Sequence, residues 1–330
     1  MVGKLAARVV FAAFLGVVGA MSMASADSAE TGVEAPGPQG PLKGTLHAAA
    51  ASNAPVVLII PGSGPTDRDG NSRLGVQASS YRLLAEGLGR RGISSVRIDK
   101  RGMFGSATAI SDANNVTIGD YADDVHAWIS SIRQKTGSDC VWVLGHSEGG
   151  LVALAAAARD ETGICGLLLV AAAGRPLGEV LREQLRANPA NAPILDQALS
   201  AIAQLEAGKP VDASKLNPAL LPLFHPSVQR FLMNALSYDP AQLLAKIRKP
   251  VLILQGQRDI QVSEEDARRL AEANPKAELR VLPDVNHVLK EVTSDDRAAN
   301  IATYADPNLP LAPGVVDAIT EFVLAGANPN

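Results

Sequence analysis

The sequence predicts an α/β fold with a mostly parallel central sheet, helices on both faces, and a helical cap inserted late in the chain. Short unbroken apolar runs alternate with segments of helical periodicity. Unbroken apolar runs indicate strands buried on both faces, and a sheet of such strands is parallel and covered by helices. We expect strands at 54–60, 93–98, 141–144, 166–170, 251–254 and 279–282, and helices at 80–91, 118–132, 148–159, 264–273 and 314–324.

The alternation stops between residues 175 and 247, where no good strand appears. A segment of this length is too long for an ordinary loop, and its periodicity indicates helices at 177–185, 194–205 and 226–236. We interpret it as a cap over the carboxyl ends of the strands, where open parallel sheets bind ligands. Its apolar side chains either line a pocket for an acyl group or form the cap's own core; they are Leu220, Leu221, Leu223, Phe224, Phe231 and Leu232.

Residues 1–26 have the composition of a secretory signal peptide. Lys4 and Arg8 precede an uncharged apolar run, and Ala24 and Ala26 supply the small residues of a cleavage site. The apolar run is shorter than the ~20 residues that span a bilayer. We therefore expect cleavage after Ala26 and a periplasmic or secreted protein without stable membrane insertion, the alternative being an uncleaved membrane anchor.

The rest of the chain divides into three parts. Residues 27–43 are rich in Gly, Pro, Ser and Glu and are expected to form a flexible lead-in. The body of the fold comprises 44–174 and 248–330, and the cap is 175–247.

Composition excludes several classes of protein. With 47 % hydrophobic and 19 % charged residues, the chain is not intrinsically disordered. The net charge of −4, which becomes −6 without Lys4 and Arg8, and the absence of a basic block argue against a nucleic-acid partner. No cluster of His, Cys and Asp has the spacing of a metal site, so neither metal nor cofactor is predicted. The oligomeric state is not predicted.

Two cysteines are too few for a disulfide scaffold, but they can form one bond. Cys140 and Cys165 each stand at the start of an apolar run, and export would put them in an oxidising compartment. If the two runs are neighbouring parallel strands, the thiols lie side by side and a disulfide is expected. The alternative is two buried free thiols.

The strongest chemical signal is Gly145-His146-Ser147-Glu148-Gly149, between an expected strand and an Ala-rich helix. The pattern G-x-S-x-G in that context predicts a nucleophile elbow, a tight turn that exposes the serine hydroxyl. Gly145 and Gly149 are needed because side chains there would meet neighbouring elements. The alternative is an ordinary glycine-rich turn with an incidental serine.

A second turn is predicted to complete an oxyanion hole. The segment 61–65, with the sequence Pro-Gly-Ser-Gly-Pro, follows the strand at 54–60. The backbone N–H groups of Ser63 and Glu148 are the expected pair of donors to an oxyanion. A simple β-turn is the alternative for 61–65.

The acid and the base are expected at the ends of the last two strands. Asp259 follows the strand at 251–254, and His287 follows the strand at 279–282. The order Ser147, Asp259, His287 is that of Ser-Asp-His hydrolases, in which the acid orients the base. Asp284 is the rival acid, but its position so close to His287 favours a bond to local backbone.

These motifs together resemble the α/β-hydrolase superfamily over residues 44–325. The segment 61–71, which contains Asp67-Arg68-Asp69, and Asp99-Lys100-Arg101-Gly102 resemble a bacterial carboxylesterase subgroup near the serine-aminopeptidase-like hydrolases. The resemblance implies an α/β-hydrolase fold and hydrolysis of short acyl esters without metal or cofactor, by Ser147, Asp259 and His287. Asp67-Arg68-Asp69 either braces the oxyanion loop or forms a solvated turn.

We therefore expect an exported serine esterase whose partner is a small-molecule ester. The first alternative is a serine peptidase or amidase of aminopeptidase type, which needs cap carboxylates to hold a substrate amine. The second is a catalytically silent binding protein on the same fold. The cap carboxylates available for the first alternative are Glu179, Glu183, Asp196 and Glu206.

Overall fold

The computed structural model describes residues 30–327. The predicted signal peptide and its cleavage site after Ala26 therefore lie outside the described residues. Within the described range, no helix combines the length and the apolar character needed to cross a membrane.

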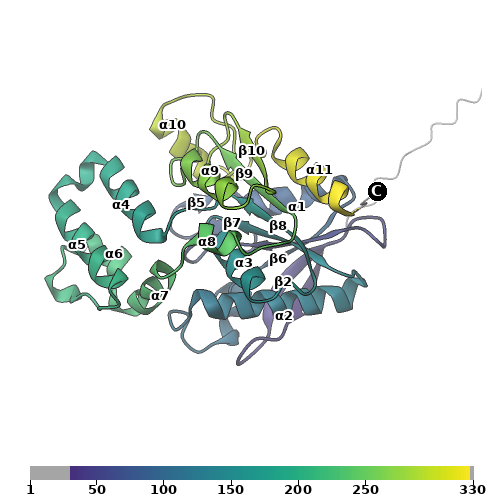
Figure 1. Ribbon diagram of the computed structural model, residues 1–330, viewed down its shortest axis with the longest axis horizontal. Coiled ribbons are helices and arrows are strands. Elements are labelled where there is room, and N and C mark those ends of the chain that lie inside the picture. Colours follow the sequence, from purple (N-terminus) through teal and green to yellow (C-terminus); the bar gives the residue numbers. More distant parts are fainter. Residues whose placement is uncertain (1–29, 328–330) are drawn as a thin grey trace, which may run out of the picture.

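The predicted α/β architecture is confirmed (Figure 1). The described residues form an eight-stranded sheet in the order β1-β2-β6-β3-β7-β8-β9-β10. β2 is antiparallel to its neighbours β1 and β6, whereas the pairs from β6 to β10 are parallel. The strands are β1 Glu30–Ala35, β2 Leu42–His47, β3 Val56–Ile60, β6 Ser94–Ile98, β7 Val141–His146, β8 Ile164–Val170, β9 Val251–Gly256 and β10 Glu278–Leu282.

The expectation of a flexible lead-in at 27–43 is wrong for its described part. Residues 30–35 and 42–47 form an antiparallel pair at the edge of the sheet. In β1 only Val33 and Ala35 are buried, and the other residues are exposed. Such a half-buried edge strand lacks the unbroken apolar run of a central strand, which explains why its polar composition was misleading.

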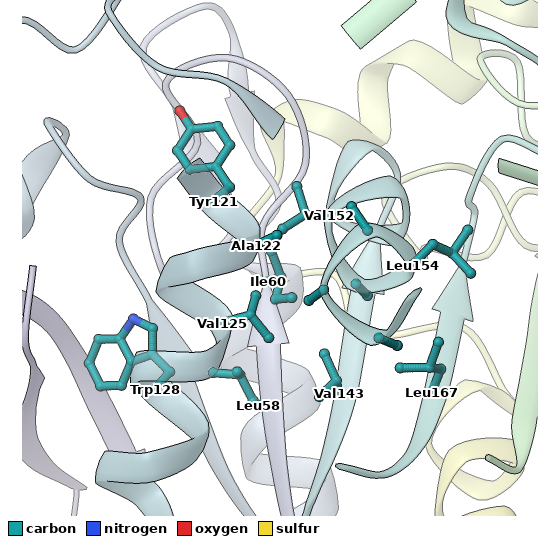
Figure 2. Close-up of a cluster of buried hydrophobic side chains, with 14 of the residues drawn as sticks. Leu58, Ile60, Tyr121, Ala122, Val125, Trp128, Val143, Val152, Leu154 and Leu167 are labelled. Atoms are coloured by element: carbon teal, nitrogen blue, oxygen red, sulfur yellow. The ribbon is translucent and has the colours of Figure 1, made fainter. Parts of the chain in front are cut away.

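Helices cover both faces of the sheet and enclose two hydrophobic cores. α2 (Ile118–Thr136), α3 (Glu148–Arg159) and α9 (Glu264–Ala273) pack on one face, and α1 (Ser80–Arg90) and α11 (Val315–Ala327) on the other. Figure 2 shows part of the first core, where α2 and α3 lie against β3, β7 and β8. The remaining short elements are the β4–β5 hairpin (Asn71–Ser72 and Val76–Gln77), α10 (Arg297–Ala302), and 3₁₀ turns at Phe104–Ala109, Pro189–Ile194, Ala213–Lys215, Pro218–Leu220 and Thr303–Ala305.

The predicted helical insertion lies between β8 and β9. It comprises α4 (Leu177–Ala187), α5 (Leu195–Glu206), α6 (Leu221–Phe224), α7 (Pro226–Leu236) and α8 (Pro240–Leu244). In Figure 1, α4 to α7 form a group beside the body of the molecule. α7 joins this group to α2, because Phe231 stacks edge-to-face on Tyr121 at 6.1 Å and the Asn234 side chain accepts the N–H of Ile118.

The apolar cap side chains serve structure rather than a pocket. Leu220, Phe224 and Leu232 belong to a separate core shared by α5, α6 and α7, and Phe231 packs against the core of the body. The expectation of a core of the cap's own is therefore confirmed for Leu220, Leu223, Phe224 and Leu232.

A disulfide joins Cys140 and Cys165. Cys140 immediately precedes β7, and Cys165 is the second residue of the adjacent parallel strand β8. The bond therefore lies at the starts of these strands, whereas Ser147 follows the end of β7.

Candidate active site

Ser147 occupies a strained turn between β7 and α3. Its φ of 54° and ψ of −121° put it among the few non-glycine residues with positive φ, as a nucleophile elbow requires. A Cβ on Gly145 would lie 2.1 Å from the carbonyl oxygen of Gly149, and a Cβ on Gly149 would lie 2.4 Å from that of Ile60. Only glycine fits at either position. The Ser147 hydroxyl has no hydrogen-bond partner among the described residues and faces a cavity that His287 also lines.

A hydrogen bond joins the side chains of His287 and Asp259. His287 Nδ1 lies 2.7 Å from Asp259 Oδ2, and both side chains are buried. The other carboxylate oxygen, Oδ1, accepts the backbone N–H groups of Gln261 and Val262 at 2.8 and 2.9 Å. Because an ionised carboxylate is an acceptor only, His287 carries its proton on Nδ1 and leaves Nε2 free to take one.

The rival acid and two of the other histidines, His126 and His225, lie elsewhere. Asp284 pairs with Arg258 at 3.4 Å and does not contact His287. His126 bonds the carbonyl of Ala156, and His225 caps the start of α7. Neither lines the cavities beside Ser147.

The expected oxyanion donors both lie beside Ser147. The N–H of Gly62 is committed to the hydroxyl of Tyr81 at 3.0 Å, whereas that of Ser63 has no acceptor among the described residues. Glu148 is the first residue of α3, so its N–H belongs to the first turn of a helix, which lacks intrahelical acceptors. Ser63, Glu148 and Ser147 line one cavity.

Two cavities meet at Ser147. The first, of about 120 Å³, is lined by His287, Tyr81 and His146, with Thr66, Val76, Val288 and Tyr304. The second, of about 140 Å³, is lined by Ser63 and Glu148 and by apolar side chains from α3 and the insertion: Leu151, Leu177, Val180 and Leu181. Ser63, Ser147 and Gln261 belong to both. The insertion therefore contributes mainly apolar walls to one side of the serine.

Tyr81 and His146 form a buried link that the sequence did not reveal. The Tyr81 hydroxyl lies 2.8 Å from His146 Nδ1, and His146 Nε2 lies 2.8 Å from the carbonyl oxygen of His287. Since Tyr81 accepts from Gly62, it must donate to His146, which must then be neutral and donate from Nε2. Burial, and next the neighbouring His287, lower the pKa of His146 to about 3, which agrees with this assignment.

The Asp67-Arg68-Asp69 segment is joined to Asp99, which follows β6. The Arg68 backbone N–H and Nε donate to the Asp99 carboxylate at 2.9 and 3.0 Å. The Asp67 carboxylate accepts the N–H groups of Asp69 and Asn71. Arg68 thus forms an ion pair with Asp99, and the bracing of the oxyanion loop by this segment stays a prediction.

The fold and the order of these residues define the class of protein. A largely parallel sheet with Ser147 at an elbow, Asp259 after β9 and His287 after β10 is an α/β-hydrolase. Residues 71–291 match the family model described as serine aminopeptidase, S33, and the chain belongs to that family.

Individual relatives are distant. Esterase EstD of Thermotoga maritima is 25 % identical over 244 residues, which are 71 % of this chain and 54 % of the relative. The chain thus spans about half the length of that protein.

Solved structures share the fold at low identity. Est1E from Butyrivibrio proteoclasticus has a TM-score of 0.55 at 17 % identity, covering 90 % of this chain and 98 % of that one. The proline iminopeptidase of Mycobacterium smegmatis has a TM-score of 0.57 at 16 % identity, covering 90 % and 100 %. Esterase Pf2001 of Pyrococcus furiosus has a TM-score of 0.56 at 18 % identity, covering 91 % and 92 %. Because an esterase and a peptidase match equally well, the fold alone does not choose between these activities.

Proposed function

We propose that this protein is an exported serine carboxylesterase that cleaves short-chain esters through an acyl-enzyme. The observation that carries the proposal is the His287–Asp259 pair, which opens onto the same cavity as the unengaged Ser147 hydroxyl. This arrangement supplies a base of defined tautomer next to a nucleophile on a strained turn.

The proposed reaction has two halves. His287 Nε2 takes the Ser147 proton as the hydroxyl oxygen attacks the ester carbonyl, and the oxyanion binds the N–H groups of Ser63 and Glu148. The tetrahedral intermediate collapses, and the leaving alcohol takes the proton from His287. Water then loses a proton to the same nitrogen and attacks the acyl-enzyme. As the second tetrahedral intermediate collapses, His287 returns this proton to the Ser147 oxygen and the acid is released.

The direction of proton transfer assigns the two cavities. The leaving alcohol must lie near His287, so the first cavity holds the alcohol. The second cavity contains both oxyanion donors but not His287, and it holds the acyl group. Its small volume and apolar walls favour a short acyl chain.

The charges of the insertion favour an ester over a peptide with a free amine. Glu183 pairs with Arg175 and Glu206 with Arg182, while Glu179 lies 3.7 Å from Arg269. None of these carboxylates lines the cavities beside Ser147, and neither does Asp196. The carboxylate that does, Glu148, faces Lys100.

The test compares p-nitrophenyl esters of increasing acyl length with aminoacyl p-nitroanilides. We expect kcat/KM to be largest for short acyl esters, and Ser147→Ala to lower it by at least about 10⁴-fold. A fluorophosphonate probe should label the wild-type protein and not the alanine variant. Faster cleavage of the anilides would replace the esterase by a peptidase, and an inert wild-type protein would support the silent binding protein.

Export has its own experiment. After expression of the full chain in a Gram-negative host, we expect the protein in the periplasm or medium with Asp27 as its first residue. Retention of residues 1–26 on a membrane-bound protein would contradict this part of the proposal.

A further inference from the structure

Lys100 is a buried lysine that contacts the oxyanion loop, residues 61–65. It follows β6, and its side chain is 4 % exposed. Its Nζ donates to the carbonyl oxygen of Gly62 at 2.7 Å and lies 3.4 Å from Glu148 Oε1. It also lies 5.5 Å from the centre of the Tyr121 ring. The proposed reaction assigns no role to the Lys100 side chain.

The contact with Gly62 fixes the direction of a catalytic N–H. The carbonyl of Gly62 and the N–H of Ser63 belong to one planar peptide, in which the two groups point in opposite directions. Because Lys100 binds the carbonyl oxygen of Gly62, the N–H of Ser63 points away from Lys100. Tyr81 holds the N–H of Gly62, so both peptides that flank this glycine are fixed.

The contact with Glu148 joins Lys100 to the second donor. Glu148 supplies the other oxyanion N–H from its backbone, while its side chain accepts from Lys100. One ammonium group therefore contacts the Gly62–Ser63 peptide, through the Gly62 carbonyl, and the side chain of Glu148. Its charge also polarises the Gly62 carbonyl, which strengthens the Ser63 N–H as a donor.

We propose that Lys100 is a positioning residue that sets the oxyanion hole by holding the Gly62–Ser63 peptide. The inference rests on the proposed esterase function. Lys100 touches no reacting atom and acts through Ser63. Its removal should therefore weaken binding of the tetrahedral intermediate more than binding of the ester.

The primary variant is Lys100→Met, which keeps the bulk and removes the ammonium. Loss of a direct oxyanion donor typically costs about 10²–10³ in kcat, and an indirect loss should cost less, on the order of 10–100-fold. We expect that fall in kcat per active site titrated with a fluorophosphonate, with KM changed by less than about threefold. The inhibition constant of a trifluoromethyl ketone, which forms a tetrahedral adduct, should rise by the same factor.

Two further variants separate positioning from other roles. Tyr121→Phe keeps the ring beside Lys100 and should leave kcat within about twofold. Lys100→Met combined with Glu148→Gln removes the carboxylate that the single variant leaves unpaired, and kcat should remain low. Recovery of kcat in the double variant would mean that Lys100 only neutralises Glu148, and would overturn the proposal.

The other possible results distinguish a failure of this inference from a failure of the proposed function. If the methionine variant does not fold, Lys100→Leu, which is smaller and also lacks a hydrogen-bond donor, takes its place. Wild-type kcat per titrated site, or an unchanged inhibition constant, in the folded Lys100 variant overturns this inference alone. An inactive wild-type protein would instead overturn the proposed esterase function.

Discussion

The two sides of the cleft at Ser147 are held in different ways. On the side of the body, the loops are joined by buried polar contacts, in which Tyr81 and His146 connect Gly62 to His287. On the side of the insertion, the walls come from α4, whose ion pairs involve exposed or half-exposed side chains such as Arg182 and Glu206.

This difference suggests that the body sets the catalytic geometry, whereas the insertion sets the range of substrates. Exposed ion pairs contribute about 0–1 kcal/mol, whereas breaking a buried polar contact leaves an unsatisfied group at a cost of about 1–3 kcal/mol. The catalytic geometry therefore depends on the body. The insertion has a core of its own, and the cavity residues Leu177 and Leu181 pack against it.

The largest effect expected on the body side comes from Asp259→Asn. An amide in place of the carboxylate favours the wrong tautomer of His287, and the equivalent change in serine proteases lowers kcat about 10⁴-fold. Asp284→Asn is the matched control and should leave kcat within about twofold, because Asp284 bonds Arg258. Steady-state kinetics on a short p-nitrophenyl ester measure both. Equal losses in the two variants would reopen the choice of acid.

The next effect concerns the stability of the body away from its site. The disulfide closes a sequence separation of 25 residues, and its loss in Cys140→Ser with Cys165→Ser should lower the free energy of unfolding by about 3 kcal/mol. Urea denaturation measures this change, and reduced wild-type protein should match the double variant. Because the bond lies at the starts of β7 and β8, kcat should not change. A parallel fall in kcat would show that the two ends of the sheet are coupled.

The elements that could be predicted are those whose burial leaves a recognisable pattern of apolar residues in the sequence. The central strands are unbroken apolar runs because both of their faces are buried, as in β3 and β7. β1 is a half-buried edge strand, and its polar residues suggested a flexible segment. The apolar cap side chains were ambiguous, because sequence does not distinguish a core from a pocket wall.

The residues of the site also fall into two groups, those that could be predicted from the sequence and those that could not. Ser147, Asp259 and His287 could be placed because each follows a recognisable strand in the order of a known chemistry. The link between Tyr81 and His146 could not be predicted, because these residues are 65 positions apart and His146 occupies a variable position of the elbow motif. Lys100 stood within a noted motif, but only the fold shows which carbonyl it reaches.

Acid should weaken the polar contacts of the body through His146. His146 has a pKa of about 3 when folded, below the ordinary histidine pKa of 6.5, so the unfolded chain takes up its proton first as the pH falls. Its contribution to stability is complete above pH 6.5 and is lost as the pH falls toward 3. Between pH 7.5 and pH 5 the loss amounts to about 2 kcal/mol.

Urea denaturation at both pH values, on wild type and His146→Asn, checks this prediction. The variant has no titrating group at this position, so the difference between its two values should be smaller by that amount. His126→Asn is the control, because His126 lies in α2 away from the site and its removal should leave the wild-type difference unchanged. The same pH dependence in His146→Asn as in wild type would assign the acid sensitivity to other groups.

The smallest effect should appear on the side of the insertion. Leu181 lines the cavity assigned to the acyl group, and Leu181→Trp should fill part of its roughly 140 Å³. We expect kcat/KM to fall about tenfold for hexanoyl and longer p-nitrophenyl esters, and by less than about threefold for the acetate. Arg186→Trp adds the same ring to an exposed position of α4 outside both cavities and should change neither. A loss that is equal for all acyl lengths would mean that α4 supports the catalytic geometry. A loss that follows the size of the alcohol would reverse the assignment of the two cavities.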